Sequence, residues 1–300
     1  MRPADPQQVV AAISAWYLAH RRELPWRAED RTPWGVLVSE VMLQQTQVAR
    51  VLPAWLAWLE RWPGPADLAR EAPGEAVRQW GRLGYPRRAL RLHAASVAIV
   101  ERHRGEVPDD PTALRALPGV GEYTAAAVQA FAFGRRAVVL DTNVRRVLAR
   151  LLGGEAIPPP SLTAAERARA EALVPQDDAA AALWAIAAME LGALICTAAS
   201  PACERCPVRE ACVWRRAGSP AYDGRPRRTQ RFAGTDRQVR GRLLAVLREH
   251  PGAVPRSALE ATWPEALQRE RALDGLVADG LVEPLAGDQY RLPGQAPSGP

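Results

Sequence analysis

Lysine is absent from this chain of 300 residues, and all 39 of its Lys and Arg positions are arginines. A lysine amine is the usual side chain for a Schiff base, so the sequence disfavours enzymes that hold a carbonyl or sugar carbon through such an intermediate. The arginines still leave a formal net charge of +6. A positive balance suits a polyanionic partner such as nucleic acid, although many basic proteins bind none.

Long apolar runs are lacking as well. No uncharged stretch approaches the roughly 20 residues that a helix needs to cross a bilayer, and the N-terminus shows no signal-peptide pattern. The hydrophobic fraction of 48% is enough to bury a core in two compact units, or in one unit with an appendix. We therefore expect a soluble, cytoplasmic protein that makes no membrane contact.

Cysteine is scarce, and its four positions fall within one short segment. Their spacing is Cys196-x6-Cys203-x2-Cys206-x5-Cys212. Disulfide frameworks of secreted proteins spread their cysteines along the chain, so these thiols indicate one site for a soft metal, either zinc or an iron–sulfur cluster. Zinc ribbons pair two C-x2-C knuckles. The segment has one such knuckle, which favours the cluster.

Apolar residues recur at three- and four-residue spacing as far as about residue 214, with Pro/Gly turns between the periodic stretches, and this predicts an all-α fold. The expected helices cover residues 9–18, 36–43, 48–61, 65–70, 75–83, 89–103, 112–117, 123–133, 142–152, 163–173 and 179–191. Residues 218–236 have the composition of a linker. Further helices at 238–248, 256–262 and 264–279, with extended pieces at 282–284 and 289–292, resemble a small winged helix-turn-helix. Residues 294–300 form a tail that we expect to be disordered.

A glycine turn joins two of the expected helices. The run Leu117-Pro118-Gly119-Val120-Gly121 precedes the helix that Tyr123 opens. Gly119 and Gly121 permit a tight turn and leave backbone N–H groups uncovered beside a helix N-terminus, where a DNA phosphate can bind. An ordinary helix–helix turn is the alternative. The order of these residues resembles the helix–hairpin–helix of base-excision repair glycosylases.

Seven segments follow one another as they do in the A/G-specific adenine DNA glycosylases (MutY family), an endonuclease III-like family that the chain resembles over about residues 8–215. They are Leu24-Pro25-Trp26-Arg27, Ser39-Glu40-Val41-Met42-Leu43-Gln44-Gln45-Thr46, Gly81-Arg82-Leu83-Gly84-Tyr85, the glycine turn, Val139-Leu140-Asp141-Thr142-Asn143-Val144-Arg145-Arg146, Met189-Glu190-Leu191-Gly192 and the cysteine segment. The resemblance implies a helix–hairpin–helix glycosylase fold. It places a six-helix barrel at 27–135 and an iron–sulfur domain at 1–26 and 136–217. Composition and periodicity place the linker at 218–236 and a winged-helix-like domain at 237–293. The resemblance also implies an iron–sulfur (4Fe-4S) cluster on the four cysteines.

Two carboxylates can supply the chemistry that the resemblance implies. Adenine is a poor leaving group, so its release from deoxyribose calls for a proton donor and for an anion beside an oxocarbenium-like sugar. Glu40 lies in an apolar helical stretch where desolvation is expected to raise its pKa, which suits the donor. Asp141 precedes a helix and suits the anion. Without the surrounding motifs, the simpler interpretation of Glu40 is an exposed helix glutamate, and that of Asp141 is an N-cap.

The resemblance assigns further roles to single residues. Endonuclease III-like enzymes carry a lysine at the position of Tyr123, and tyrosine cannot form their covalent intermediate. Tyr123 and Asn143 are implied to support the two catalytic carboxylates. The flipped adenine is expected against Trp26, Arg27 and Glu190, with Gln45 and Tyr85 wedged into the base stack.

The expected activity is that of a monofunctional enzyme. It removes adenine mispaired with 8-oxoguanine or guanine from double-stranded DNA, and we expect it to act as a monomer. The chain departs from the family at Pro86, where a second aromatic is usual, at Thr142, where glycine is usual, and in lacking a Nudix-like C-terminal domain. A thymine glycosylase acting on G·T mismatches and a non-catalytic iron–sulfur DNA-binding regulator are the alternatives.

Overall fold

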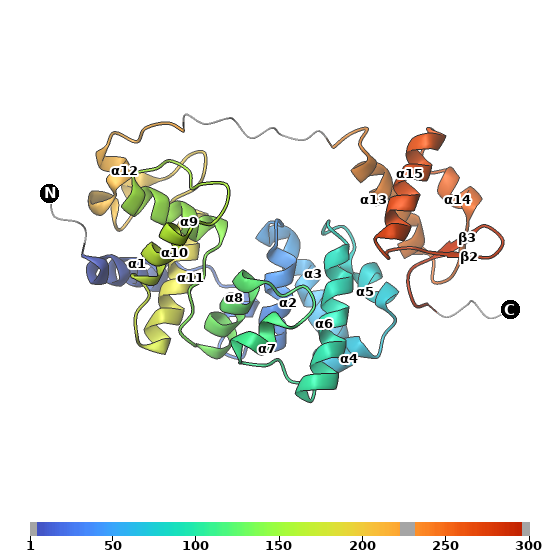
Figure 1. The fold of residues 1–300 in the computed structure, drawn as a ribbon, viewed down its shortest axis with the longest axis horizontal. Helices are drawn as coiled ribbons and strands as arrows, with labels where there is room; N and C mark the ends of the chain where they lie inside the picture. Colours follow the sequence, from blue (N-terminus) through green and yellow to red (C-terminus); the bar gives the residue numbers. More distant parts are fainter. Residues whose placement is uncertain (1–4, 223–231, 296–300) are drawn as a thin grey trace. The chain divides into compact units, whose positions relative to one another are not determined.

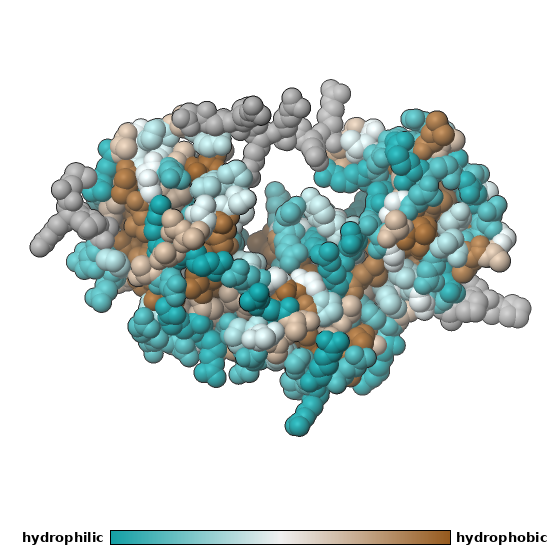
Figure 2. Space-filling model, viewed as in Figure 1, coloured by the Kyte–Doolittle hydropathy of each residue, from teal (hydrophilic) through white to brown (hydrophobic). Residues whose placement is uncertain are grey.

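The computed structural model describes residues 5–222 and 232–295, and helices joined by short turns make up most of this part of the chain (Figure 1). The all-α class predicted from the apolar periodicity is confirmed. Among these residues no helix is both long and apolar enough to span a bilayer. Part of the expected linker and the end of the expected tail lie outside the described residues. Hydrophilic side chains cover much of the visible surface, with small apolar groups between them (Figure 2).

The described residues form two compact units. The first takes its residues from Met1–Val36, Asp109–Thr112 and Val120–Pro226, and the second from Leu37–Pro108, Ala113–Gly119 and Arg227–Pro300. The chain therefore crosses between the units within helix α2 (Pro33–Leu43) and again around the glycine turn. The domain division expected from the resemblance stays a prediction.

Helix α1 and the segments after residue 120 make up the first unit. Its elements are α1 (Pro6–His20), η1 (Pro25–Arg27), α8 (Glu122–Phe133), α9 (Thr142–Leu148), the π-helical η2 (Ala149–Gly153), α10 (Ala164–Glu171), α11 (Asp178–Leu194), η3 (Cys203–Arg205), η4 (Arg209–Ala211) and α12 (Val213–Arg216). Side chains of α1, α9 and α11 share one apolar core, in which Ile13, Val147 and Leu191 are buried. A second cluster joins α8 to α11 and to the start of α2.

Local capping explains where several of these helices begin. The Asp5 side chain accepts the Gln7 N–H at the start of α1, and Pro6 supplies a φ angle already suited to the first turn. Thr163 and Glu166 form a reciprocal capping box on α10. The predicted start of α10 agrees with the observed one to within one residue, whereas α1 begins three residues before the predicted start, because its cap precedes the first apolar residue.

A tryptophan cluster lies at the centre of the second unit. Its helices before residue 120 are the remainder of α2, α3 (Val48–Arg61), α4 (Pro65–Ala69), α5 (Pro73–Trp80), α6 (Arg87–His103) and α7 (Pro111–Arg115). The Trp58 ring makes edge-on contacts with Trp62 and Trp80, with centroids 4.7 and 5.7 Å apart. All three side chains are fully buried. Edge-on aromatic pairs add to the stabilisation that burial itself provides.

The C-terminal part has the helices and the hairpin that the sequence predicted. It consists of α13 (Asp236–Glu249), β1 (Val254–Pro255), α14 (Arg256–Glu260), α15 (Ala266–Ala278), β2 (Glu283–Leu285) and β3 (Gln289–Arg291), drawn in orange and red in Figure 1. The antiparallel sheet has the order β1-β3-β2, and Tyr290 pairs with Val254 on one side and Pro284 on the other. Strand β1 was not predicted, because two residues carry no alternation.

Helix α5 carries the contact between this C-terminal part and the rest of the second unit. The Arg78 guanidinium donates to the carbonyls of Leu247, Arg248 and His250, which end α13. The N–H of Gly74 donates to Pro293 O at 2.8 Å. A Cβ at Gly74 would lie 2.7 Å from that oxygen, so glycine is required by this close approach. The first residues of the expected tail take part in the same contact, because the Gln295 side-chain amide donates to Glu75 of α5.

Candidate active site

Asp141 is the N-cap of α9. Its Oδ1 accepts the Val144 N–H at 2.6 Å, and its Oδ2 accepts the Asn143 side-chain amide at 2.7 Å. Burial raises the pKa of Asp141 above its ordinary value, while these hydrogen bonds and the charge of Arg146 act in the opposite direction. Asp141 therefore does act as an N-cap, which was the alternative interpretation of this residue from the sequence. Each oxygen keeps a lone pair, so capping leaves the carboxylate able to meet a cation.

Asn143 connects Asp141 to the start of the cysteine segment. Its Oδ1 accepts from Arg146 Nη2 at 2.8 Å, and Arg146 Nε donates to the Cys196 carbonyl at 2.7 Å. The same guanidinium reaches Gly192 O at 2.6 Å. A Cβ at Gly192 would approach the Asn143 Cβ to 2.7 Å, so α9 lies close against α11 at this point. The side chain of Asn143 is thus fixed from both ends.

A second arginine holds the cysteine segment itself. Arg150 is 3% exposed, and its fork donates to the carbonyls of Ala156, Thr197 and Ala198. Its Nη1 also lies 3.4 Å from the Cys196 Sγ. Arg150 therefore holds Thr197 and Ala198, the residues directly after Cys196, and contacts the first thiol of the segment.

The four thiols are unoxidised and close enough to influence one another. Burial, together with the charges of Cys196, Cys212 and Cys203, raises the pKa of Cys206 to about 11. Burial likewise raises the pKa of Cys212. Within residues 5–222 and 232–295, no three or more His, Cys, Asp or Glu side chains are grouped as ligands of a single ion would be.

Glu190 is enclosed by arginines. Its side chain is fully buried and pairs with Arg22 Nη2 at 2.7 Å and Arg27 Nη1 at 2.9 Å. The Arg22 Nε and backbone N–H also donate to Oε1. Burial acts to raise the pKa of Glu190, but the bonds and charges of Arg22 and Arg27 outweigh it and lower the value. Because Arg27 ends η1, Glu190 ties that short helix, with the buried Trp26, to α11.

Glu40 is buried and Tyr123 is half-buried, and the two residues belong to different units. Glu40 lies on α2 and is 5% exposed, beside the buried residues Ser39 and Val41. The exposed-glutamate interpretation of Glu40 is therefore wrong. Tyr123, in the first turn of α8, is half-buried against the cluster that contains Val36.

The two residues expected to enter the base stack are both exposed and both strained. Gln45 has φ +56° and Tyr85 has φ +47°, in the left-handed region that non-glycine residues seldom adopt. Tyr85 is 52% exposed. Pro86, which replaces the usual second aromatic, is the N-cap of α6 and has helical dihedral angles. Its ring therefore starts the helix.

The glycine turn has the conformation that its residues predict. Gly119 has φ +80°, and a Cβ there would also approach the Arg91 Cβ to 2.8 Å. Gly121 is the N-cap of α8, and its carbonyl accepts the Ala125 N–H at 2.9 Å. The turn and the first N–H groups of α8 are therefore arranged as a helix–hairpin–helix requires.

The predicted site residues are divided between the two units. The first unit contains Trp26, Arg27, Gly121, Tyr123, Asp141, Asn143, Glu190, Cys196, Cys203, Cys206 and Cys212, and the second contains Glu40, Gln45, Tyr85 and Gly119. Direct hydrogen bonds join Asp141 to Asn143 and Arg27 to Glu190. Sequence reasoning missed Arg22 and gave Arg146 no role. An isolated arginine gives no signal of a buried partner that lies far along the chain.

Comparison with known proteins agrees with this geometry. Residues 38–172 match the HhH-GPD superfamily of base excision DNA repair proteins. An adenine DNA glycosylase of Mycolicibacterium smegmatis is 49% identical over 288 residues, which cover 96% of this chain and 97% of the relative. The chain belongs to the adenine DNA glycosylase family. The match with that adenine DNA glycosylase extends into the winged-helix-like part, which the two proteins therefore share.

Solved structures confirm the fold of this adenine DNA glycosylase family member. A thermostable thymine-DNA glycosylase is similar with a TM-score of 0.62 and 28% identity, over 70% of this chain and 97% of that one. A trapped endonuclease III–DNA covalent intermediate is similar with a TM-score of 0.61 and 25% identity, over 72% and 99%. The predicted helix–hairpin–helix glycosylase fold is confirmed. The roles of the single site residues stay predictions.

Proposed function

We propose that the protein is a monofunctional glycosylase that binds double-stranded DNA as a monomer inside the cell and releases adenine mispaired with 8-oxoguanine or guanine. The match with an adenine DNA glycosylase over nearly the whole length of both chains is the observation that carries the proposal. The retention of two suitably different carboxyl groups supports it. Glu40 is buried, and Asp141 accepts hydrogen bonds from the Val144 N–H and the Asn143 amide.

The reaction is a hydrolysis in which a proton passes to the base and water adds to the sugar. Glu40 donates its proton to a ring nitrogen of the extruded adenine, the bond between adenine and C1′ breaks, and the electron pair leaves with the base. Water then attacks C1′ and returns a proton to the Glu40 carboxylate. The products are free adenine and an abasic sugar, and the acid is regenerated.

Asp141 supplies the anion that the cationic sugar needs. Two donors, the Val144 N–H and the Asn143 amide, fix the orientation of its carboxylate before the substrate arrives. A charge that is already oriented does not have to reorganise as the transition state forms, which is the general origin of electrostatic catalysis. Arg146 keeps the Asn143 side chain in its donating orientation.

Strand cleavage is not part of the proposed reaction. The chain has no lysine, and Tyr123 lies in the first turn of α8, at the position that the resemblance aligns with the lysine of lyase relatives. Without that amine the abasic sugar is released intact. Adenine release and strand cleavage should therefore separate completely in an assay.

The spacing of the four cysteines supports an iron–sulfur cluster. Its four cysteines are free thiols, and Arg150 directs an N–H toward Cys196. We propose that Cys196, Cys203, Cys206 and Cys212 hold a 4Fe–4S cluster, which would fix the loop that carries the exposed Arg205 and Arg209. The purified protein should contain about four irons per chain by elemental analysis, as expected for a cluster of this type. Stoichiometric zinc would overturn this assignment.

One gel tests the proposed activity. Duplexes containing adenine opposite 8-oxoguanine, adenine opposite guanine, and thymine opposite guanine are incubated with the protein, and half of each sample is then treated with alkali. We expect breakage of the adenine strand only after alkali. Breakage of the thymine strand would identify a thymine glycosylase instead, and intact strands throughout would indicate a DNA-binding regulator.

Replacing the proton donor gives a sharper test. Glu40→Gln keeps the shape of the side chain but removes its acidic proton, so we expect adenine release to fall by at least about 100-fold, the usual contribution of general acid catalysis. DNA affinity should be unchanged in a gel-shift assay. Glu101→Gln, on the exposed surface of α6, is the matched control. A Glu40→Gln variant that releases adenine at the wild-type rate would refute the assignment.

A further inference from the structure

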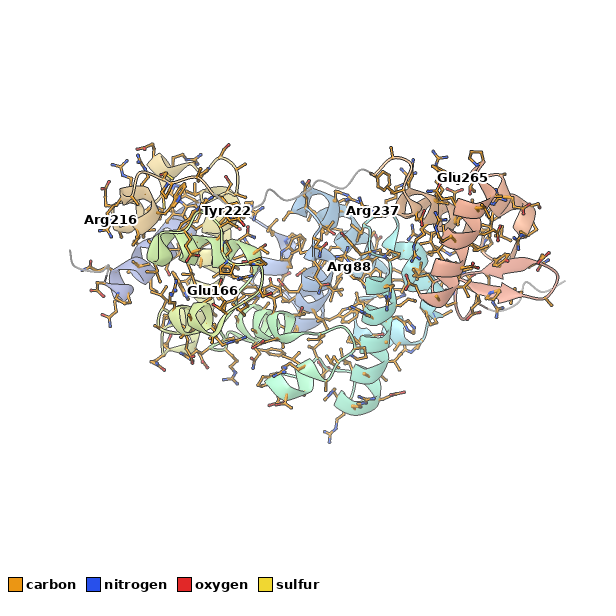
Figure 3. The ribbon with its side chains drawn as sticks, turned by 45° about the horizontal axis from the view of Figure 1, so that its top comes forward. Arg88, Glu166, Arg216, Tyr222, Arg237 and Glu265 are labelled. Carbon is orange, nitrogen blue, oxygen red and sulfur yellow. The ribbon has the colours of Figure 1, made fainter. Side chains whose placement is uncertain are left out.

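Two exposed turns of the second unit are held by one buried side chain. Gln45 follows α2 and Tyr85 precedes α6, and both have a positive φ angle. A left-handed backbone at a residue other than glycine persists only where its surroundings enforce it. The buried side chain of Arg88, labelled in Figure 3, enforces this conformation, because polar groups of the residues that flank both turns bind it.

Arg88 joins the two turns through both arms of its guanidinium. Nη1 donates to the carbonyls of Val41, Met42 and Gln44 at 2.8, 2.9 and 2.7 Å. Nη2 donates to Thr46 Oγ1 and to Gly84 O, each at 3.0 Å. These partners lie on both sides of Gln45 and directly before Tyr85.

The ring of Tyr85 is part of the same arrangement. The Arg88 guanidinium carbon lies 5.6 Å from the Tyr85 ring centroid and 5.1 Å from that of Trp80. Arg88 is 6% exposed, so these contacts are shielded from water. A planar cation over aromatic faces is favourable in such a setting. The backbone of one turn and the side chain of the other are therefore fixed by one group.

Charge explains why this position needs an arginine. Val41 and Met42 belong to the last turn of α2, whose carbonyls have no partner within the helix and carry the negative end of its dipole. Burial lowers the pKa of Arg88 to about 10, and the charge of Arg50 also lowers it. The group stays protonated at neutral pH. Among the described residues no carboxylate pairs with it, so backbone dipoles compensate its charge.

A lysine cannot reproduce this arrangement. Its ammonium is a single nitrogen with three donors, whereas the arginine fork presents two separated nitrogens that reach two different segments. A lysine at position 88 would satisfy the end of α2 or the Gly84 turn, but not both.

We propose that Arg88 is a positioning residue that presents Gln45 and Tyr85 to the duplex and ties them to α2, the helix that carries Glu40. The inference rests on the proposed function, because it takes the opening of a base stack as the task of the two turns. Arg88 itself is buried and touches no base. Its contribution is to keep two strained, exposed residues in place while they displace the stack.

The test compares a paired adenine with one that has no partner base. Single-turnover release is measured for Arg88→Lys on adenine opposite guanine and on adenine in a one-nucleotide bulge, where little stacking has to be opened. We expect the rate on the paired substrate to fall roughly 10- to 100-fold, the loss typical of a misplaced group. On the bulge it should fall less than about threefold. Arg102→Met, an exposed arginine of the same helix, is the control.

Thr46→Val provides a second variant in case Arg88→Lys does not fold. It removes one acceptor of Arg88 and keeps the side-chain shape, so the same substrate pattern is expected with a smaller loss on the paired adenine. Equal losses on both substrates, or no loss on either, would overturn the inference. If the wild-type protein releases adenine from neither substrate, the proposed function fails instead. The two failures are therefore distinguishable.

Discussion

Neutralising Glu190 tests whether a buried ion pair holds the short helix η1. The carboxylate is fully buried and receives three hydrogen bonds from Arg22 and one from Arg27. In Glu190→Gln the amide keeps the shape of the side chain, but one acceptor oxygen becomes a donor that faces a guanidinium. Two arginines lose their counter-charge, and because each oxygen accepts two hydrogen bonds, two of these bonds become contacts between donors.

The expected loss follows from the burial of the three partners. Removing one partner of a buried ion pair destabilises a protein by about 3–5 kcal/mol. The side chains of Arg27 and Arg22 are 12% and 33% exposed, so water solvates part of the uncompensated charge. We therefore expect Glu190→Gln to lower the free energy of unfolding by about 2–4 kcal/mol. At roughly 2–4 °C per kcal/mol, the melting temperature should fall by about 4–16 °C.

Denaturant unfolding followed by circular dichroism measures this change. The pKa of Glu190 is lowered in the folded state, so its contribution is complete above the ordinary value of 4.5 and is lost as the pH falls through the lower folded value. The difference between wild type and variant should therefore shrink in acid. Arg22→Met, which removes the more exposed partner, should cost less. A loss below about 1 kcal/mol for Glu190→Gln at pH 7 would show that the arginines find other compensation, and would refute the reasoning.

Two further changes probe the network at Asp141 and the docking of the C-terminal part. Arg146→Met removes one of the two contacts that hold the Asn143 side chain, so we expect single-turnover adenine release to slow by roughly 10-fold or more with DNA affinity unchanged, and a wild-type rate would contradict this. Gly74→Val places a side chain against Pro293 O and should release the C-terminal part, seen as faster proteolysis between residues 217 and 236. Gly241→Val, where a Cβ has open space, should be cut at the wild-type rate, and equal rates for both variants would contradict the docking.

The sequence predicted the helices well because their signals are local. Asp141 caps α9 within its own segment, and Gly119 adopts the positive φ that its turn was expected to need. Strand β1 was missed because it is defined by pairing with β3, more than thirty residues later in the chain. An element of two residues has no period of its own, and its existence depends on a partner that local patterns do not reveal.

Site residues that belong to a recognisable motif were predicted from the sequence. Site residues that depend on contacts with distant parts of the chain were missed. Glu40, Asp141 and the cysteines stood out because the surrounding residues have a recognisable order. Arg22 did not, because its partner Glu190 lies 168 positions away. The exposed Arg209 of the cysteine segment pairs with Glu204 and Glu210, which the sequence does not indicate. Ion pairs of this kind depend on the three-dimensional path of the loop, which local sequence patterns do not reveal.

Several arginines of this chain have a structural role in addition to supplying positive charge. Arg78, Arg88, Arg146 and Arg150 each donate to two or more backbone carbonyls at helix ends or in loops. Carbonyls in these places lack a partner within the helix, and a fork with five donors can satisfy several at once. A lysine would satisfy fewer, with no fixed geometry between its donors. The net charge of +6 therefore overstates the positive charge that the surface can offer to DNA, because some of the arginines are buried and bind the carbonyls of helix ends. It follows that exchanging these arginines for lysine would keep the charge and lose the contacts that join separate segments, whereas the same exchange at exposed arginines would change little.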